Sequence, residues 1–141
     1  MYRYKIEELE KWKQSNNRKP LIIRGARQVG KTWLMKEFGE KYYEKCAYIN
    51  FDDNTRMDKL FEEDFDLERI IQGLKIESGV NIEPENTLII LDEIQESPKA
   101  LKALKYFCEN AREYHIISAG SLLGVAIHAG TSFPVGKVDF L

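Results

Sequence analysis

The stretch Gly25-Ala26-Arg27-Gln28-Val29-Gly30-Lys31-Thr32 has the form GxxxxGK[ST] and follows directly on the apolar run Leu21-Ile22-Ile23. The glycines allow the backbone to turn with its N–H groups pointing inward, at the start of a helix whose dipole favours an anion. In such a loop the lysine reaches the β- and γ-phosphates and the threonine hydroxyl meets Mg²⁺. The sequence therefore predicts a site for a nucleoside triphosphate. The residues expected to contact the nucleotide are Gly25, Ala26, Arg27, Gln28, Val29, Gly30, Lys31, Thr32 and Trp33.

An acidic pair completes the predicted site. Asp92 and Glu93 come directly after the apolar run Leu88-Ile89-Ile90-Leu91, where a Walker B pair is expected. Asp92 would hold Mg²⁺ through its water shell, together with Thr32. Glu93 would point at the attacking water as the general base. The two motifs together predict hydrolysis of the nucleotide rather than binding alone.

Composition places the chain among ordinary soluble globular proteins. It has 141 residues, of which 43% are hydrophobic and 31% charged, so one domain with a sizeable core is expected. No apolar run approaches the roughly 18 residues of a membrane-spanning helix, and the N-terminus has no apolar signal segment. We expect a cytoplasmic protein without a membrane partner.

The charge is distributed unevenly. Residues 1–36 carry ten lysine and arginine residues against three glutamates, although the net charge of the chain is −2. Such a basic segment can indicate nucleic acid. Because Arg24, Arg27 and Lys31 already serve the phosphate loop, the phosphate site is the favoured explanation. Nucleic acid remains a partner that the sequence does not support by itself.

Hydrophobic periodicity predicts alternating helices and strands. A helix is expected at 4–14 and a second one from the phosphate loop to Gly39, and Asp66 and Ser97 are predicted N-caps of later helices. The expected strands are 21–24, 46–51, 88–91, 114–118 and 137–141, and the further helical segments are 56–63, 67–78, one starting at Pro98, and 122–129. This order predicts an α/β fold, a three-layer P-loop NTPase sandwich whose mostly parallel sheet of about five strands is flanked by helices.

The adjacent glutamate narrows the class of phosphate-loop protein. The chain contains neither the Asn-Lys-x-Asp motif of GTPases nor the Leu-Ser-Gly-Gly signature of ABC-type ATPases. The remaining class has an extra strand between the phosphate-loop strand and the Walker B strand, and this strand ends in a polar sensor residue. Tyr114-His115-Ile116-Ile117 followed by Ser118-Ala119-Gly120-Ser121 fits that position. Either Ser118 or Ser121 is the expected sensor.

These motifs together resemble one family. The segments 24–32, Leu91-Asp92-Glu93-Ile94-Gln95 with Pro98 after it, 118–121, and Ser132-Phe133-Pro134-Val135-Gly136-Lys137-Val138 are similar to those of the AAA-like ATPases of bacteria and archaea. The resemblance implies an ATPase core at 1–141, using ATP and Mg²⁺. Members usually carry a nuclease-like C-terminal domain of unknown function after this core, so the chain is expected to be an N-terminal fragment. Ala119 and Leu122 depart from the usual Thr/Ser-Gly-Ser-Ser pattern, which leaves the choice of sensor serine open.

Two functions share the predicted site. The first is an ATPase in which Lys31, Thr32, Asp92 and Glu93 act with a serine sensor. The second is a switch that binds ATP or ADP with little turnover and signals to a C-terminal domain or partner. The difference lies in an arginine finger, which is worth roughly 10³–10⁵ in rate. No arginine follows Arg112, so a finger would come from the missing C-terminal part, from a neighbouring subunit of a homo-oligomer, or from Arg27.

Overall fold

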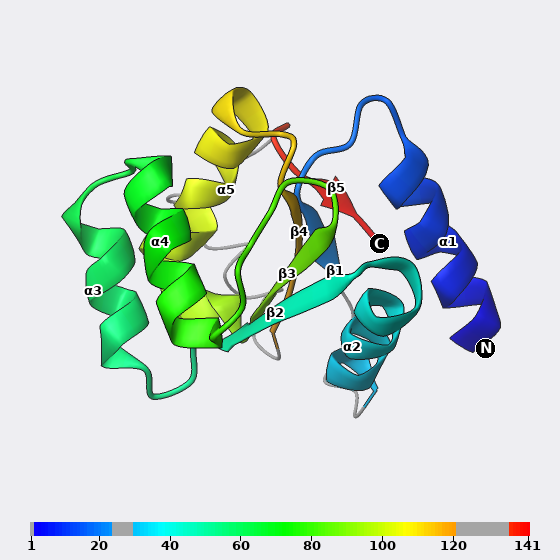
Figure 1. Cartoon of the computed structure of the whole chain (residues 1–141), viewed down its shortest axis with the longest axis horizontal. Coiled ribbons are helices and arrows are strands. Elements are labelled where there is room, and N and C mark those ends of the chain that lie inside the picture. The colour runs from blue at the N-terminus through cyan, green and yellow to red at the C-terminus, as the bar shows by residue number, and fades with distance from the viewer. Residues whose placement is uncertain (1, 24–29, 121–135) are drawn as a thin grey trace.

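A parallel five-stranded sheet forms the centre of the molecule (Figure 1). The computed structural model describes residues 2–23, 30–120 and 136–141. The strands are β1 (Leu21–Ile23), β2 (Lys45–Asn50), β3 (Thr87–Asp92), β4 (His115–Ala119) and β5 (Asp139–Phe140). The helices are α1 (Tyr2–Gln14), α2 (Lys31–Tyr42), α3 (Thr55–Glu63), α4 (Leu67–Ser78) and α5 (Pro98–Asn110), with a short 3₁₀ turn, η1 (Ile94–Glu96). The predicted three-layer α/β fold is confirmed.

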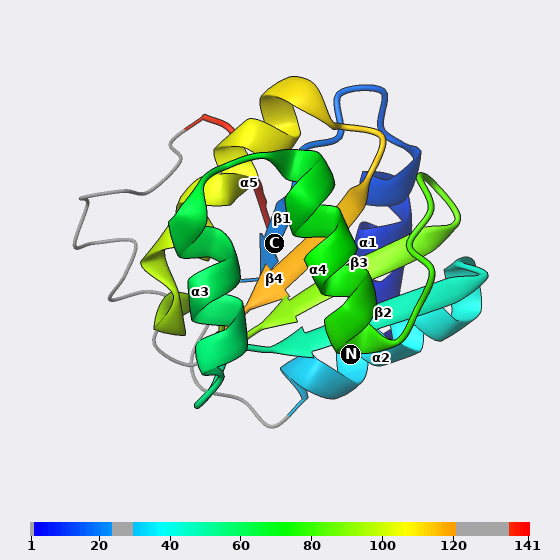
Figure 2. The ribbon, with the colours of Figure 1, turned by 60° about the vertical axis from the view of Figure 1, so that its left-hand side comes forward.

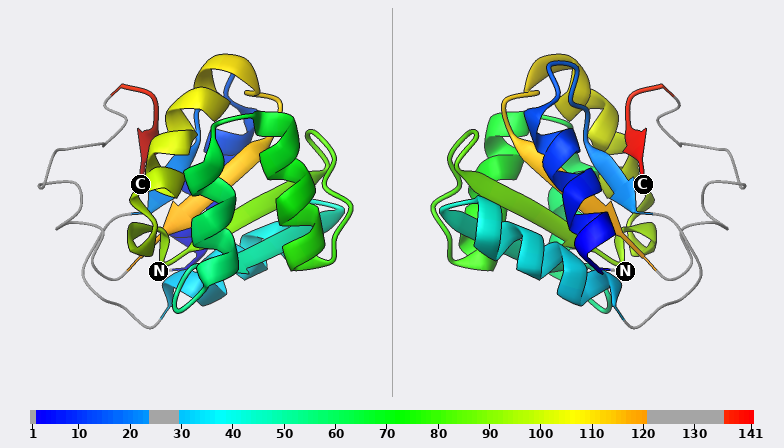
Figure 3. Two further views of the ribbon diagram at one scale, coloured as in Figure 1. Left: turned by 90° about the vertical axis from the view of Figure 1, so that its left-hand side faces the viewer. Right: turned by 90° about the vertical axis from the view of Figure 1, so that its right-hand side faces the viewer.

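Helices cover both faces of the sheet. The two views of Figure 3 show α3, α4 and α5 in front of one face, and α1 and α2 in front of the other. The alternation of side chains along each strand produces two separate cores. Ile89 and Leu91 of β3 pack on the first face, whereas Leu88 and Ile90 pack on the second. β3 is buried along its whole length, as its unbroken apolar run predicts for a central parallel strand.

The strand order is β2-β3-β4-β1-β5, and every neighbouring pair is parallel. β4 therefore lies between β1 and β3, which confirms the extra strand expected from the sequence. Ile23 pairs with Ala119, and Ala119 pairs with Asp92. The carboxyl ends of β1, β3 and β4 consequently meet at one edge of the sheet (Figure 2). Residues that follow these three strands are brought together there.

Two of the predicted helix boundaries are confirmed in detail. The Asp66 side chain caps α4 by accepting a hydrogen bond from the backbone N–H of Arg69, and Gly79 ends that helix in the left-handed conformation. Ser97 caps α5 in the same way, with Pro98 at the first helical position. Both signals are local, because each cap bonds to a residue three positions away.

The predicted end of α2 at Gly39 is wrong. The helix continues through Gly39 to Tyr42. A Cβ atom at position 39 would lie 2.8 Å from Cys46 Sγ and 3.3 Å from a methyl group of Leu88. The glycine therefore lets α2 pack closely on the sheet, and it does not end the helix. The helical segment predicted at 122–129 lies outside the described residues, and the strand predicted at 137–141 comprises Asp139 and Phe140.

Among the described residues, no helix has the length and apolar character needed to span a membrane.

Candidate functional site

The phosphate-loop lysine and threonine open helix α2. Gly30 stands at the N-cap, and its carbonyl accepts the hydrogen bond of the Leu34 N–H at 2.8 Å. Lys31 extends toward the end of β4, where its Nζ donates to the Gly120 carbonyl at 3.4 Å. Trp33 is 51% exposed in the same first turn. The other predicted contacts of the nucleotide lie outside the described residues: Gly25, Ala26, Arg27, Gln28 and Val29.

Thr32 and Asp92 are in direct contact, although 60 residues separate them. Thr32 Oγ1 donates to Asp92 Oδ2 at 2.6 Å. Tyr48 Oη donates to the same carboxylate oxygen at 2.7 Å, and the Glu93 N–H donates to Asp92 Oδ1 at 3.0 Å. Asp92 is only 5% exposed, and a buried polar group is costly unless it is hydrogen-bonded. The acidic residue of the predicted magnesium site is thus held by three donors from this chain.

The donor set of this site fits Mg²⁺. A hydroxyl and a carboxylate are hard oxygen ligands, which Mg²⁺ prefers, and the ion usually takes its other ligands from phosphates and water. A cage of protein ligands is not needed. The described part of the chain contains no group of three or more His, Cys, Asp or Glu side chains that could hold a metal ion. Thr32 and Asp92 are the residues that could hold it, with a nucleotide supplying phosphate oxygens.

Glu93 adopts an uncommon backbone conformation at the end of β3. Its φ of 54° and ψ of 43° lie in the left-handed region, where a residue other than glycine is strained. The carboxylate is oriented by a neighbour, because Gln95 Nε2 donates to Glu93 Oε1 at 2.9 Å. The Gln95 amide in turn rests against Gly120, where an added Cβ would lie 2.9 Å from Gln95 Cδ. Gln95 therefore links the predicted base to the segment that follows β4.

The two candidate sensors are placed differently. Ser118 is completely buried within β4 and pairs with Leu91, one position before the strand ends. It follows Ile116 by two positions and so shares the face covered by α3, α4 and α5, opposite to the face of Asp92. Its Oγ has no hydrogen-bond partner among the described residues. Ser121 lies outside the described residues. The sensor assignment stays a prediction.

Tyr48 and Gln95 contact the site, and sequence reasoning missed both roles. Burial and the hydrogen bond to Asp92 raise the pKa of the Tyr48 hydroxyl, so that it remains a protonated donor. The sequence signal for Tyr48 is only its position near the end of a strand. Its contact with Asp92 depends on β2 lying beside β3, with Asn50 paired to Asp92. Gln95 gave no local signal either, because its partner at Gly120 follows a different strand.

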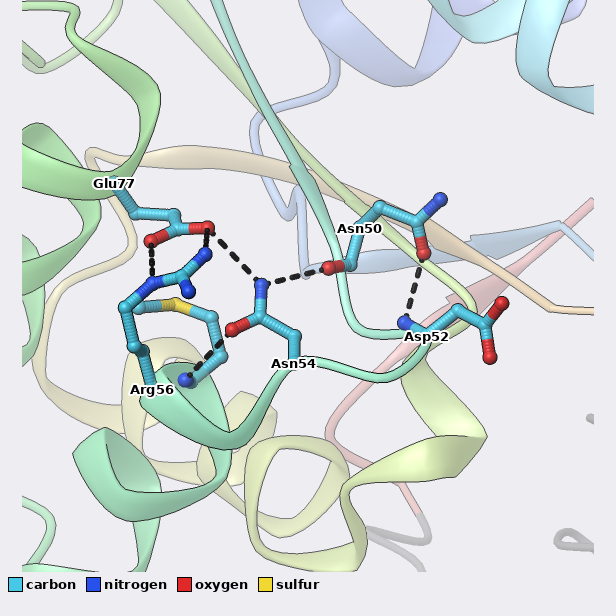
Figure 4. Close-up of polar contacts among 6 residues, drawn as sticks. Asn50, Asp52, Asn54, Arg56 and Glu77 are labelled. Atoms are coloured by element: carbon cyan, nitrogen blue, oxygen red, sulfur yellow. Dashed lines mark hydrogen bonds and ion pairs between the residues drawn. The ribbon is translucent and has the colours of Figure 1, made fainter.

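The turn after β2 is fixed by a polar network at the same edge of the sheet (Figure 4). Asn54 is buried, caps α3 through the Met57 N–H, and donates to the Asn50 carbonyl and to Glu77 Oε2, both at 3.0 Å. Arg56 forms two hydrogen bonds with the Glu77 carboxylate, at 2.9 and 3.0 Å. The Arg56 hydrogen bond is the largest cause that lowers the pKa of Glu77. This network holds the end of β2 in place beside Asp92.

Residues 17–141 match the model of a family described as AAA domain. The chain belongs to the AAA domain family. Membership of this family agrees with the predicted P-loop fold. The strand order and the contact between Thr32 and Asp92 are those observed in this chain. No curated protein matches it.

Solved structures share the fold of this AAA domain. The Walker-type ATPase of Pyrococcus abyssi matches with a TM-score of 0.59 and 15% identity, over 99% of this chain and 53% of that one. The Aeropyrum pernix ORC1 protein, solved in complex with DNA, matches with a TM-score of 0.53 and 16% identity, over 99% of this chain and 43% of that one. The Thermotoga maritima RuvB Holliday junction branch migration motor matches with a TM-score of 0.54 and 12% identity, over 99% of this chain and 44% of that one. The AAA domain thus spans about half the length of these chains, and identities this low show the fold alone.

Proposed function

We propose that this AAA domain binds ATP together with Mg²⁺ and hydrolyses the nucleotide. The observation that carries the proposal is the 2.6 Å hydrogen bond from Thr32 Oγ1 to Asp92 Oδ2. It joins the first turn of α2 to the carboxyl end of β3, so the hydroxyl and the carboxylate that P-loop ATPases use for Mg²⁺ already face each other. Family membership supports the same activity.

Each residue of the site has a distinct part in the proposal. Lys31 binds the β- and γ-phosphates, because it is the lysine of the phosphate-loop motif and opens α2. Thr32 and Asp92 hold Mg²⁺, which when bound neutralises charge on the phosphate oxygens. Glu93 accepts the proton of the attacking water as the general base, a role worth roughly 10²–10⁴ in rate. The 2.9 Å hydrogen bond from Gln95 orients the Glu93 carboxylate.

A slow nucleotide switch is the second candidate function. The observation that favours it is the same Gln95 hydrogen bond, because it occupies an oxygen of the Glu93 carboxylate that would otherwise face the attacking water. The sequence has no arginine after Arg112. An arginine finger would then come from Arg27, from a neighbouring subunit or from a further domain. In the switch, the bound nucleotide would change the contacts of this AAA domain with that partner.

Phosphate release and ATP affinity distinguish these functions. Glu93→Gln should keep the ATP affinity measured by calorimetry and lower turnover by about 10²–10⁴. The matched control is Glu62→Gln, which changes an exposed glutamate of α3 and should leave turnover unchanged. A wild type that binds ATP but turns over no faster than Glu93→Gln would favour the switch. A protein that does not bind ATP would overturn both functions.

We also propose that the AAA domain acts together with a C-terminal domain. The support is the length of the matched structures, of which this chain covers 43–53%. The DNA and the Holliday junction named for two of those structures belong to those proteins, and DNA binding is not part of the proposal. Turnover that rises with protein concentration would support an arginine supplied in trans by a second copy.

A further inference from the structure

Tyr48 reaches the predicted magnesium site from the neighbouring strand. In the β2–β3 ladder, Tyr48 pairs with Ile90 and Asn50 pairs with Asp92. Tyr48 therefore stands one pleat before the strand end, on the face of the sheet to which Asp92 also points. Its Oη lies 2.7 Å from Asp92 Oδ2, the oxygen that also accepts the Thr32 hydroxyl at 2.6 Å.

The direction of these hydrogen bonds follows from the chemistry of the groups. An ionised carboxylate only accepts, so both hydroxyls donate to Asp92. Thr32 donates its single proton to Asp92, which leaves the lone pairs of Thr32 Oγ1 available to a metal ion. The Tyr48 hydroxyl gives the same carboxylate oxygen a second donor that does not come from the nucleotide-binding helix.

The Tyr48 ring is also held in position. Lys36, one turn beyond Thr32 on α2, places its Nζ 4.0 Å from the centre of the ring. The ring lines an open cavity of about 410 Å³ with Lys36, Gly39 and Cys46 among its other walls. It is half-buried and packs against the core of this face, so losing the hydroxyl alone, with the ring kept, should not unpack the sheet. The hydroxyl is thus placed by packing that is independent of Asp92.

We propose that Tyr48 is a positioning residue for Mg²⁺ binding, acting by holding the Asp92 carboxylate against the Thr32 hydroxyl. The inference rests on the proposed function, because it assigns Mg²⁺ to this pair. Tyr48 touches neither the nucleotide nor the metal ion in this scheme. Its effect is confined to the part of the ATP affinity that depends on Mg²⁺.

The test is a calorimetric titration of ATP at increasing Mg²⁺ and in excess chelator. Tyr48→Phe should raise the Mg²⁺ concentration needed for half of the affinity gain by about tenfold, as is typical when an outer partner of a metal ligand is removed. Its ATP affinity in chelator should equal that of wild type. The matched control is Tyr43→Phe, which removes a buried hydroxyl with a similarly short hydrogen bond, 2.6 Å to His115 Nδ1, away from Asp92. The control should keep the wild-type Mg²⁺ dependence.

Asp92→Asn separates failure of this inference from failure of the proposed function. If Asp92→Asn leaves the Mg²⁺ dependence unchanged, the magnesium site itself is wrong. If Asp92→Asn raises the Mg²⁺ concentration that ATP binding requires and Tyr48→Phe does not, the positioning role alone is overturned. If both variants raise this Mg²⁺ concentration, the double variant should need no more Mg²⁺ than Asp92→Asn alone, because Tyr48 acts through that carboxylate. Additive losses, or a Tyr48→Phe protein that does not fold, would instead assign the hydroxyl a role in the fold and overturn the inference.

Discussion

The buried histidine His115 should make the stability of this domain fall between pH 7 and pH 5. His115 opens β4 and is only 4% exposed. Its ring packs edge-on against Trp12 and Tyr43, and its Nδ1 lies 2.6 Å from Tyr43 Oη. Burial is the main cause that lowers the pKa of His115 from its ordinary value of 6.5 to about 4, and the charges of Arg18 and Lys13 add to the effect.

The sign and size of the effect follow from this difference in pKa. At pH 5 the unfolded chain carries a proton on this ring and the folded chain does not, so protonation favours unfolding. The stabilisation is fully present above pH 6.5 and is lost as the pH falls toward the folded pKa of about 4. The whole difference corresponds to roughly 3 kcal/mol, of which about 2 kcal/mol is lost between pH 7 and pH 5.

The assay is urea unfolding at both pH values for wild type and for His115→Gln. Glutamine does not titrate in this range and keeps a polar group near the Tyr43 hydroxyl. All other titrating groups are common to the two proteins, so their contributions cancel in the difference of unfolding free energies. The stability advantage of wild type over His115→Gln should shrink by about 2 kcal/mol from pH 7 to pH 5. A difference that stays constant with pH would refute the argument that His115 is kept neutral by burial.

Further predictions concern the phosphate loop, the packing of α2 and the arginine finger. Lys31→Ala should weaken ATP binding at least about tenfold in a folded protein, because a charged donor to the phosphates is lost; calorimetry showing less than a threefold change would contradict it. Gly39→Ala should lower the unfolding free energy by about 1–2 kcal/mol in spite of the better helix propensity of alanine. Adding Cys46→Ala should recover part of that loss in urea titrations, since Cys46 Sγ is the atom that the new methyl group would meet. ATP turnover per molecule should rise over a hundredfold range of protein concentration if a second copy supplies the arginine; constant activity would make Arg27 the next residue to replace.

Much of the site is visible in the sequence because its signals are local. The phosphate loop, its lysine and its threonine lie within eight consecutive positions, and the acidic pair directly follows an apolar strand. The caps of α4 and α5 are equally local, because Asp66 and Ser97 each bond to a backbone group three residues on. Such patterns require only the geometry of one turn, so they can be read without knowing how the chain packs.

Only the tertiary structure decided which segments meet at the carboxyl edge of the sheet. Tyr48 and Asp92 are 44 residues apart, and their contact depends on β2 standing beside β3. The contact of Gln95 with Gly120 likewise depends on how the strands pack. At Gly39 the sequence suggested the end of a helix, whereas the close approach of α2 to Cys46 requires a residue without a side chain. The motifs of the sequence determined the chemistry available to this chain. The order of its strands decided which side chains hold that chemistry in place, because strand order is set by packing across the whole sheet and leaves no local pattern.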